Sequence, residues 1–349
     1  MLGVFRSKGV VCLCACLALF LTAGGASAQM TKPEIVAAAK KEGKVVFYTT
    51  GFKDINTKIA EGFKEKFGIS VEWLFLGTEA LIGKFTSEFQ LGAPSADVLW
   101  ISSVPVSLRK EGYLAQYHSS ETAAIPKSVL EVFNKPNGYW YPGIMVLYVI
   151  GVNTKHVPMA EAPKSWKDLT DPRFKDKIIY ADPNFSGDVL RVISTIGTKL
   201  HNWDFYEKFA ANNPMIVRGH GQVQTFLESG ERPIAGEQGH QRLLKSKNKG
   251  NPIETVWPEE GIIVSPWSFA ISKKAPHPNA ARLLIDYMLT QEVQQMFVDV
   301  WSIYPVRKGV SPPKGLPKME DLKLVTADTD WLEANKSKTK KRFWNYIGK

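Results

Sequence analysis

Hydrophobic residues recur along this chain at two spacings, and the change from one spacing to the other predicts alternating strands and helices. Residues 44–50 (KVVFYTT) form a short β-branched and aromatic run. A stripe with a spacing of four then follows, made by Ile55, Ile59, Phe63 and Phe67, and Gly68 is placed to end that helix. A strand at 70–76, a helix carrying Leu81, Ile82, Phe85 and Phe89, and a strand at 97–101 complete the pattern. Such alternation indicates βαβ units and a mostly parallel sheet covered by helices.

A second set of elements begins with the apolar run 146–152, which we expect to be a strand that crosses between two lobes. It continues with a strand at 177–180, a turn at 181–187, helices at 188–200 and 203–212 and a strand at 233–235. The chain then returns through β-like segments at 262–264 and 268–271 and one long helix at 281–297. The expected division is a first lobe of 29–148 plus 262–310, a second lobe of 149–261, and a C-terminal helical segment of 311–349.

The first 28 residues carry the features of a cleavable export signal. Arg6 and Lys8 precede an apolar run at 10–21, and the small residues 26–28 (ASA) supply a cleavage site. The run is shorter than the roughly 20 residues that span a bilayer. The sequence therefore predicts a periplasmic protein, with a lipid-attachment signal around residues 13–16 as the alternative. All three cysteines, Cys12, Cys14 and Cys16, lie in this segment, so the mature chain would have no disulfide and no thiolate.

The net charge and the absence of known catalytic motifs limit the classes of function that the sequence supports. The formal net charge of +10 becomes +8 without Arg6 and Lys8, and this excess favours an anionic ligand. A basic run at 336–342 followed by aromatic residues could indicate nucleic-acid binding. In an exported protein we favour a solvated helix face instead, with no nucleic-acid partner. The sequence contains no GxxxxGK(S/T), GxGxxG, GxSxG or HExxH motif, and its six histidines are scattered. It predicts no catalytic residue, metal site or cofactor.

Candidate binding residues follow from the expected sheet, because ligands bind at the carboxyl ends of parallel strands. Thr49, Thr50 and Gly51 end the first strand, and Ser102 and Ser103 end the third. Ser186 and Gly187 stand where a helix is expected to begin, so that their N–H groups and the serine hydroxyl could hold an oxyanion. Trp267 is expected to form a cleft wall against the organic part of the ligand. Neutral hydroxyl donors of this kind suit a carboxylate or a phosphonate.

Seven segments occur in one order across nearly the whole mature chain: EGKVVFYTT, FKEKFGISVEW, ADVLWIS, NGYWYP, APKSWKDLTDPRFKDKIIYADPNFSG, GEQGH and KKAPHPNAARLLIDYMLTQEVQQMF. In this set the chain resembles the iron(III)-type branch of the periplasmic solute-binding proteins of ABC importers. The resemblance implies an α/β, type II periplasmic-binding-protein fold, whose two lobes close on the ligand about a hinge. It also implies a monomer that delivers its solute to an inner-membrane ABC permease and performs no catalysis.

The chain departs from this family pattern at the iron ligands. The positions of the expected histidine, carboxylate and tyrosine pair read Phe52, residues 101–103 and residues 239–242 (GHQR). Ferric iron needs anionic oxygen donors, so we expect a small organic or oxyanionic solute instead. Glu237 and His240 are expected to be polar contacts at the cleft mouth. Three alternatives stay open: a ferric-iron carrier, an exported hydrolase that uses Glu237 and His240 as acid and base, and the ligand-binding subunit of a sensor.

Overall fold

The computed structural model describes residue 3 and residues 32–317 and 319–348. The predicted export signal lies outside the described residues. The strands are β1 (Lys44–Thr49), β2 (Ser70–Phe75), β3 (Val98–Ile101), β4 (Tyr141–Asn153), β5 (Ile178–Ala181), β6 (Met215–Val217), β7 (Ile234–Gly239), β8 (Ile253–Val256), β9 (Ile262–Ile271) and β10 (Leu324–Val325). The helices are α1 (Lys32–Glu42), α2 (Lys53–Phe67), α3 (Thr78–Gln90), α4 (Val106–Lys110), α5 (Lys127–Val132), α6 (Gly187–Thr195), α7 (Asp204–Ala210), α8 (His220–Ser229), α9 (His240–Asn248), α10 (Pro278–Met288), α11 (Gln291–Trp301) and α12 (Thr329–Ile347).

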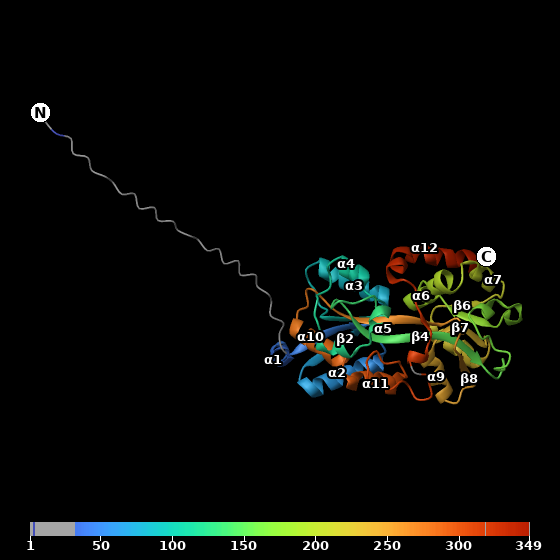
Figure 1. The fold of residues 1–349 in the computed structure, drawn as a ribbon, viewed down its shortest axis with the longest axis horizontal. Coiled ribbons are helices and arrows are strands. Elements are labelled where there is room, and N and C mark those ends of the chain that lie inside the picture. Colours follow the sequence, from blue (N-terminus) through green and yellow to red (C-terminus); the bar gives the residue numbers. More distant parts are fainter. Residues whose placement is uncertain (1–2, 4–31, 318, 349) are drawn as a thin grey trace. The chain divides into compact units, whose positions relative to one another are not determined.

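Two long strands join two lobes. The strand order is β2-β1-β3-β9-β4-β7-β5-β6, with β8 paired to β4 and β10 paired to β9. Near its start β4 runs antiparallel to the part of β9 that also pairs with β3, and near its end β4 pairs with β7 and β8. The parallel group β2-β1-β3 belongs to the first lobe and the parallel group β7-β5-β6 to the second (Figure 1). The predicted α/β architecture is present, and 146–152 lies in the crossing strand β4 as predicted.

Alternation along β1 divides the first lobe into two layers. Phe47 belongs to the core that contains the α2 stripe, whereas its neighbour Tyr48 belongs to the core that contains the α3 stripe. Successive side chains on a strand point to opposite faces, so the sheet is covered on both sides. Gly68 ends α2 in the left-handed conformation at φ 73°, as the sequence predicted.

The C-terminal helix α12 packs against the second lobe. Phe343 of α12 is fully buried and packs against Tyr180 of β5 and Tyr206 of α7, with ring centroids 6.2 and 5.5 Å apart. At its other end, Asp330 of α12 pairs with Lys110 of α4 at 2.9 Å. Figure 1 shows α12 in red beside α6 and α7. This helix therefore contacts elements of both lobes.

Two predicted elements differ from the structure. The prediction of a single helix at 281–297 is wrong, because α10 and α11 are separate helices. Thr290 is the N-cap residue of α11, and its hydroxyl accepts a hydrogen bond from the Val293 N–H. The segments 262–264 and 268–271 are one strand, β9, which continues through Pro266. Within the described residues, no helix is long and apolar enough to cross a membrane.

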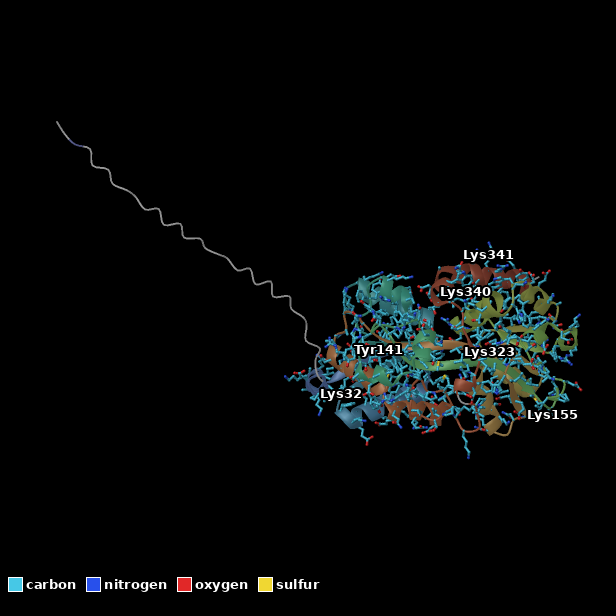
Figure 2. All side chains as sticks on the ribbon, in the orientation of Figure 1. Lys32, Tyr141, Lys155, Lys323, Lys340 and Lys341 are labelled. Carbon is cyan, nitrogen blue, oxygen red and sulfur yellow. The ribbon has the colours of Figure 1, made fainter. Side chains whose placement is uncertain are left out.

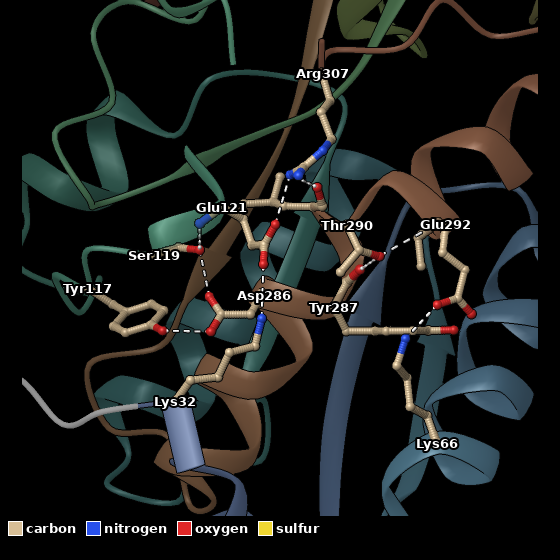
Figure 3. A network of polar contacts seen from close by, with 12 residues as sticks. Lys32, Lys66, Tyr117, Ser119, Glu121, Asp286, Tyr287, Thr290, Glu292 and Arg307 are labelled. Atoms are coloured by element: carbon tan, nitrogen blue, oxygen red, sulfur yellow. Dashed lines mark hydrogen bonds and ion pairs between the residues drawn. The ribbon is translucent and has the colours of Figure 1, made fainter. Parts of the chain in front are cut away.

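A buried carboxylate ties α10 to the long loop after α4 (Figure 3). Asp286 is only 2 % exposed and accepts hydrogen bonds from the Tyr117 hydroxyl, at 2.8 Å, and from the Ser119 hydroxyl. Burial raises the pKa of Asp286, although these two hydrogen bonds act in the opposite direction. Next to it, Glu121 forms ion pairs with Lys32 and Arg307 at 2.9 and 2.8 Å. The network joins four separate stretches of the first lobe.

Replacing Asp286 with Ala is expected to lower the free energy of unfolding by about 3 kcal/mol, because two buried hydroxyls lose their acceptor. Asp286→Asn keeps one acceptor oxygen and should lose less. Urea unfolding monitored by tryptophan fluorescence measures the change, with the exposed Glu61→Ala variant as control. Equal stability of Asp286→Ala and Glu61→Ala would contradict the assigned role.

Candidate functional site

A cavity of about 180 Å³, here named the central cavity, lies where β4 and β9 pass between the lobes. The first lobe contributes residues after β1, β2 and β3, and the second lobe contributes the starts of α6, α8 and α9. The cavity therefore lies at strand ends, as expected for an α/β fold. Its lining residues are Thr50, Phe52, Phe75, Leu76, Gly77, Thr78, Ser102, Tyr148, Phe185, Ser186, Gly187, Asp188, His220, Gln241, Arg242 and Trp267.

Arg242 brings a positive charge to the central cavity. Its guanidinium lies over the ring of Trp301, 5.9 Å from the centroid, and forms no ion pair with the described residues. Burial lowers the pKa of Arg242, while Tyr148, Asp188 and Glu237 act to raise it. A guanidinium stays protonated at neutral pH even so. The cavity thus contains a cation without a direct carboxylate partner.

The start of α6 faces the same space. Ser186 is the N-cap residue, and its hydroxyl oxygen accepts from the Val189 N–H at 3.4 Å. Apart from its chain neighbours and the backbone of α6, no atom of the described residues lies within 4 Å of the position that a Cβ on Gly187 would take. The first turn of a helix offers N–H donors and a partial positive charge to an anion. Ser186 and Gly187 both line the central cavity.

Asp188, the next residue, connects α6 to two residues of the crossing strand β9. Its carboxylate accepts hydrogen bonds from the Ser265 hydroxyl and, at 3.1 Å, from the Trp267 indole N–H. Burial, followed by the charges of Asp188 and Glu237, raises the pKa of Tyr148 well above its ordinary value, so this phenol is a neutral hydrogen-bonding group. Asp188 therefore links α6 to β9.

A second buried carboxylate orients a histidine. Glu237 is fully buried, accepts from the Ala181 N–H at 3.2 Å, and lies 2.7 Å from Nε2 of His220. The His220 ring is 5.3 Å from the ring of Tyr148, measured between centroids. His220 lines the cavity while Glu237 lies behind it.

Stacked aromatic rings form the apolar wall. Phe52 stacks on Trp267 at a centroid distance of 5.7 Å and on Trp301 at 4.0 Å. Two further rings, Phe75 and Phe185, reach the cavity from opposite lobes and are 41 % and 62 % exposed. The organic part of a small solute can pack against such a wall.

Hydroxyl groups of the first lobe face the start of α6 across the cavity. The Thr50 hydroxyl donates to the Trp100 carbonyl at 3.2 Å. The Ser102 and Thr78 hydroxyls are 2.6 Å apart. Each of these three side chains lines the central cavity.

The ten residues selected from the sequence divide into three groups. Five of them line the central cavity, namely Thr50, Ser102, Ser186, Gly187 and Trp267. Ser103 lines an adjoining outer pocket of about 490 Å³. The remaining four, Thr49, Gly51, Glu237 and His240, line neither space.

These four residues have structural contacts instead. The Thr49 hydroxyl accepts from the Gly51 N–H at 2.9 Å and donates to Asn56 at 3.1 Å. Gly51 packs against Trp100, because a Cβ at this position would lie 2.2 Å from the indole ring. His240 is 1 % exposed and its Nε2 lies 2.9 Å from the Ser302 carbonyl. Glu237 and His240 are thus buried behind the cavity rather than at the cleft mouth, and the partner of Glu237 is His220.

Three important lining residues were not selected from the sequence. Arg242 lies three residues after Gly239, the last residue of β7, and Asp188 is in the first turn of α6, so the strand-end and helix-start rules could have included both. His220 begins α8, a helix that the sequence analysis missed. Across residues 32–317 and 319–348, no group of three or more His, Cys, Asp or Glu side chains is placed to hold a metal ion.

The sequence profile of a family described as bacterial extracellular solute-binding protein matches residues 94–335. A periplasmic protein of Salmonella typhimurium, provisionally named as 2-aminoethylphosphonate-binding, is 25 % identical over 263 residues, which are 72 % of this chain and 74 % of that protein.

Solved structures show the same fold. Iron-bound HitA from Pseudomonas aeruginosa is similar with a TM-score of 0.73 and 22 % identity, over 86 % of this chain and 99 % of HitA. AfuA from Actinobacillus pleuropneumoniae, with fructose-6-phosphate bound, has a TM-score of 0.74 and 20 % identity, over 88 % of this chain and 99 % of AfuA. AfuA is named as a periplasmic binding protein, and the likeness confirms the predicted type II periplasmic-binding-protein fold of this chain.

Proposed function

This chain belongs to the family of bacterial extracellular solute-binding proteins, and we propose that its central cavity binds the anionic end of a small organic solute. The observation that carries the proposal is the Arg242 guanidinium, which lines the cavity and forms no ion pair with a carboxylate of the described residues. A partly buried charge is costly unless an opposite charge joins it, so the cavity favours an anion.

Family and relatives confirm the general function predicted from the sequence. The chain is the substrate-binding component of an ABC import system and works outside the cytoplasm, in the periplasm, as its relatives do. The family binds small solutes and passes them to ABC permeases, and solute-binding proteins of this kind are not enzymes. Residues 1–28 are our proposed export signal.

Further groups support an anion at this position. The N–H groups at the start of α6 can donate to oxyanion atoms, and the Ser102 hydroxyl can donate from the facing lobe when it accepts from Thr78. Phosphonate, phosphate and carboxylate groups accept several hydrogen bonds at once and suit a guanidinium. The provisional name of the Salmonella relative, with its phosphonate, agrees with this class of ligand.

The volume and the aromatic wall of the central cavity limit the size of the organic part of the solute. The cavity volume of about 180 Å³ is below the roughly 300–1,000 Å³ of sites for drug-sized ligands. A short carbon chain can lie against Phe52 and Trp267, with Tyr148 and Gln241 as polar neighbours. We propose a solute of a few carbon atoms, bound between a first lobe of 29–148 plus 262–310 and a second lobe of 149–261, by a monomer.

Mass spectrometry of ligand that co-purifies with the protein, followed by calorimetry with propylphosphonate and with the uncharged propanol, tests this function. We expect one-to-one binding of the phosphonate, no detectable binding of the alcohol, and thermal stabilisation that follows ligand concentration. A visible charge-transfer band after addition of ferric citrate, without phosphonate binding, would instead support the iron carrier. Turnover of a bound ester would support a hydrolase.

A further inference from the structure

The outer pocket adjoins the central cavity. The two share Gly77, Thr78, Ser102, Phe185, Ser186 and Gly187 as lining residues. Beyond this shared rim, the outer pocket is enclosed by the start of α3, by α6 and by α12. A solute anchored in the central cavity therefore has space to extend past Ser186 and beneath the C-terminal helix.

Positive side chains dominate the outer pocket. Its cations are Arg191, Arg218, Lys336 and Lys340, and its carboxylates are Glu79 and Glu333. Lys336 pairs with Glu333 at 3.0 Å, and Arg218 lies over the Phe185 ring at 4.9 Å. The buried Arg191 donates through Nη1 to Thr326 and Ala327. Lys340 forms no ion pair with the described residues, so the pocket has an uncompensated positive charge.

Helical spacing explains how α12 supplies two of these cations. Leu332, Thr339 and Phe343 form its buried stripe, and Lys336 and Lys340, one turn apart, flank that stripe and line the outer pocket. Lys338 and Lys341 are exposed and belong to the other face. Figure 2 shows Lys341 at the outer edge of α12 and Lys340 closer to the body of the molecule. Within the basic run at 336–342, Lys336 and Lys340 therefore line the outer pocket, whereas Lys338 and Lys341 face the solvent.

We propose that the outer pocket is a second anion subsite, so that the imported solute carries two anionic groups. This rests on the proposed function, because the first group occupies the central cavity beside Arg242. The second group, a carboxylate or phosphate, lies beside Arg218, Lys336 and Lys340. The same cations repel an ammonium group at this end of the solute. Lys336 and Lys340 are therefore specificity-determining residues.

Calorimetry with three phosphonates of equal chain length tests this second subsite. The ligands are 3-phosphonopropionate, propylphosphonate and 2-aminoethylphosphonate, whose far ends are anionic, neutral and cationic. For the unmodified protein we expect affinity to decrease in that order. In the Lys336→Met, Lys340→Met double variant, affinity for 3-phosphonopropionate should fall about tenfold, and affinity for propylphosphonate should stay the same. The salt dependence of 3-phosphonopropionate binding should also become weaker in this variant.

The matched control is the Lys338→Met, Lys341→Met double variant, which removes the same charge from the exposed face of α12 and should bind all three ligands normally. The subsite is rejected if the two double variants behave alike, or if 2-aminoethylphosphonate binds as tightly as 3-phosphonopropionate. Normal binding of propylphosphonate in that case would leave the proposed function intact. Absence of binding by all three phosphonates would overturn both proposals.

Discussion

Arg242→Met is expected to weaken binding of propylphosphonate at least about 100-fold, the largest loss that we predict for a single side chain. The guanidinium supplies charge-assisted hydrogen bonds to the phosphonate, and bonds of this kind contribute about 1.5–3 kcal/mol each. A factor of 100 corresponds to about 2.7 kcal/mol. Met keeps much of the apolar stem that packs near Trp301. Calorimetry at constant ionic strength measures the loss.

The same substitution should not destabilise the unliganded protein. Arg242 is a partly buried cation with no ion-pair partner among the described residues, so its removal relieves a desolvation cost, and we expect an equal or higher Tm. Lys245→Met, on the same helix and also over Trp301, at 3.9 Å, is the control and should bind the phosphonate normally. If both variants bind as the unmodified protein does, the anion lies elsewhere.

Lowering the pH from 7 to 4 is expected to cost the protein about 3 kcal/mol of stability through His240 alone. Burial lowers the pKa of His240 from 6.5 to about 4 in the folded state. Nε2 donates to the Ser302 carbonyl, and backbone hydrogen bonds to Ser302 and Leu147 act to raise the pKa, but burial outweighs them. Above pH 6.5 His240 is neutral in both states, so its full contribution to stability is present there. Below pH 6.5 the unfolded chain takes up the proton first, and stability is lost down to about pH 4.

Urea unfolding of His240→Gln at pH 7 and at pH 4 isolates this contribution, because the other titrating groups cancel in the comparison with the unmodified protein. Gln retains a donor for the Ser302 carbonyl and does not titrate, so its stability should fall by about 3 kcal/mol less over this pH range. His156→Gln, at an exposed histidine, is the matched control. An unchanged pH dependence in His240→Gln would show that His240 titrates normally.

Periodicity predicted the first lobe well because its strands and helices have clear local patterns. The alternation in β1 and the stripe of α2 both reflect two-sided burial in a layered sheet, and Gly68 marks the end of α2. The break between α10 and α11 was missed because the apolar spacing continues across it. There a single hydroxyl, that of Thr290, decides where the second helix begins.

Site residues were harder to predict because their roles depend on contacts between distant segments. Thr49 and Thr50 are neighbours at one strand end, yet Thr49 bonds to Asn56 inside the lobe while Thr50 lines the cavity. His220 and His240 both begin helices after glycine, but only His220 reaches the cavity. Which of two similar residues faces the ligand is set by the register of the sheet and the packing behind it, and no local spacing reports this.

The two crossing strands, β4 and β9, form the base of the central cavity. Tyr148 of β4 and Trp267 of β9 lie on paired strands that belong to both lobes, so lobe rotation changes their separation little. The register of β4 against β7 shifts between Val149 and Gly151, directly after Tyr148. The hydrogen bonds of Asp188 to Ser265 and Trp267 hold the first turn of α6, with Ser186, on the same base. Tyr148, Trp267 and Ser186 therefore belong to one connected base of the central cavity, and Thr50 and Ser102 line it from the first lobe, so a solute held between them joins this base to the first lobe.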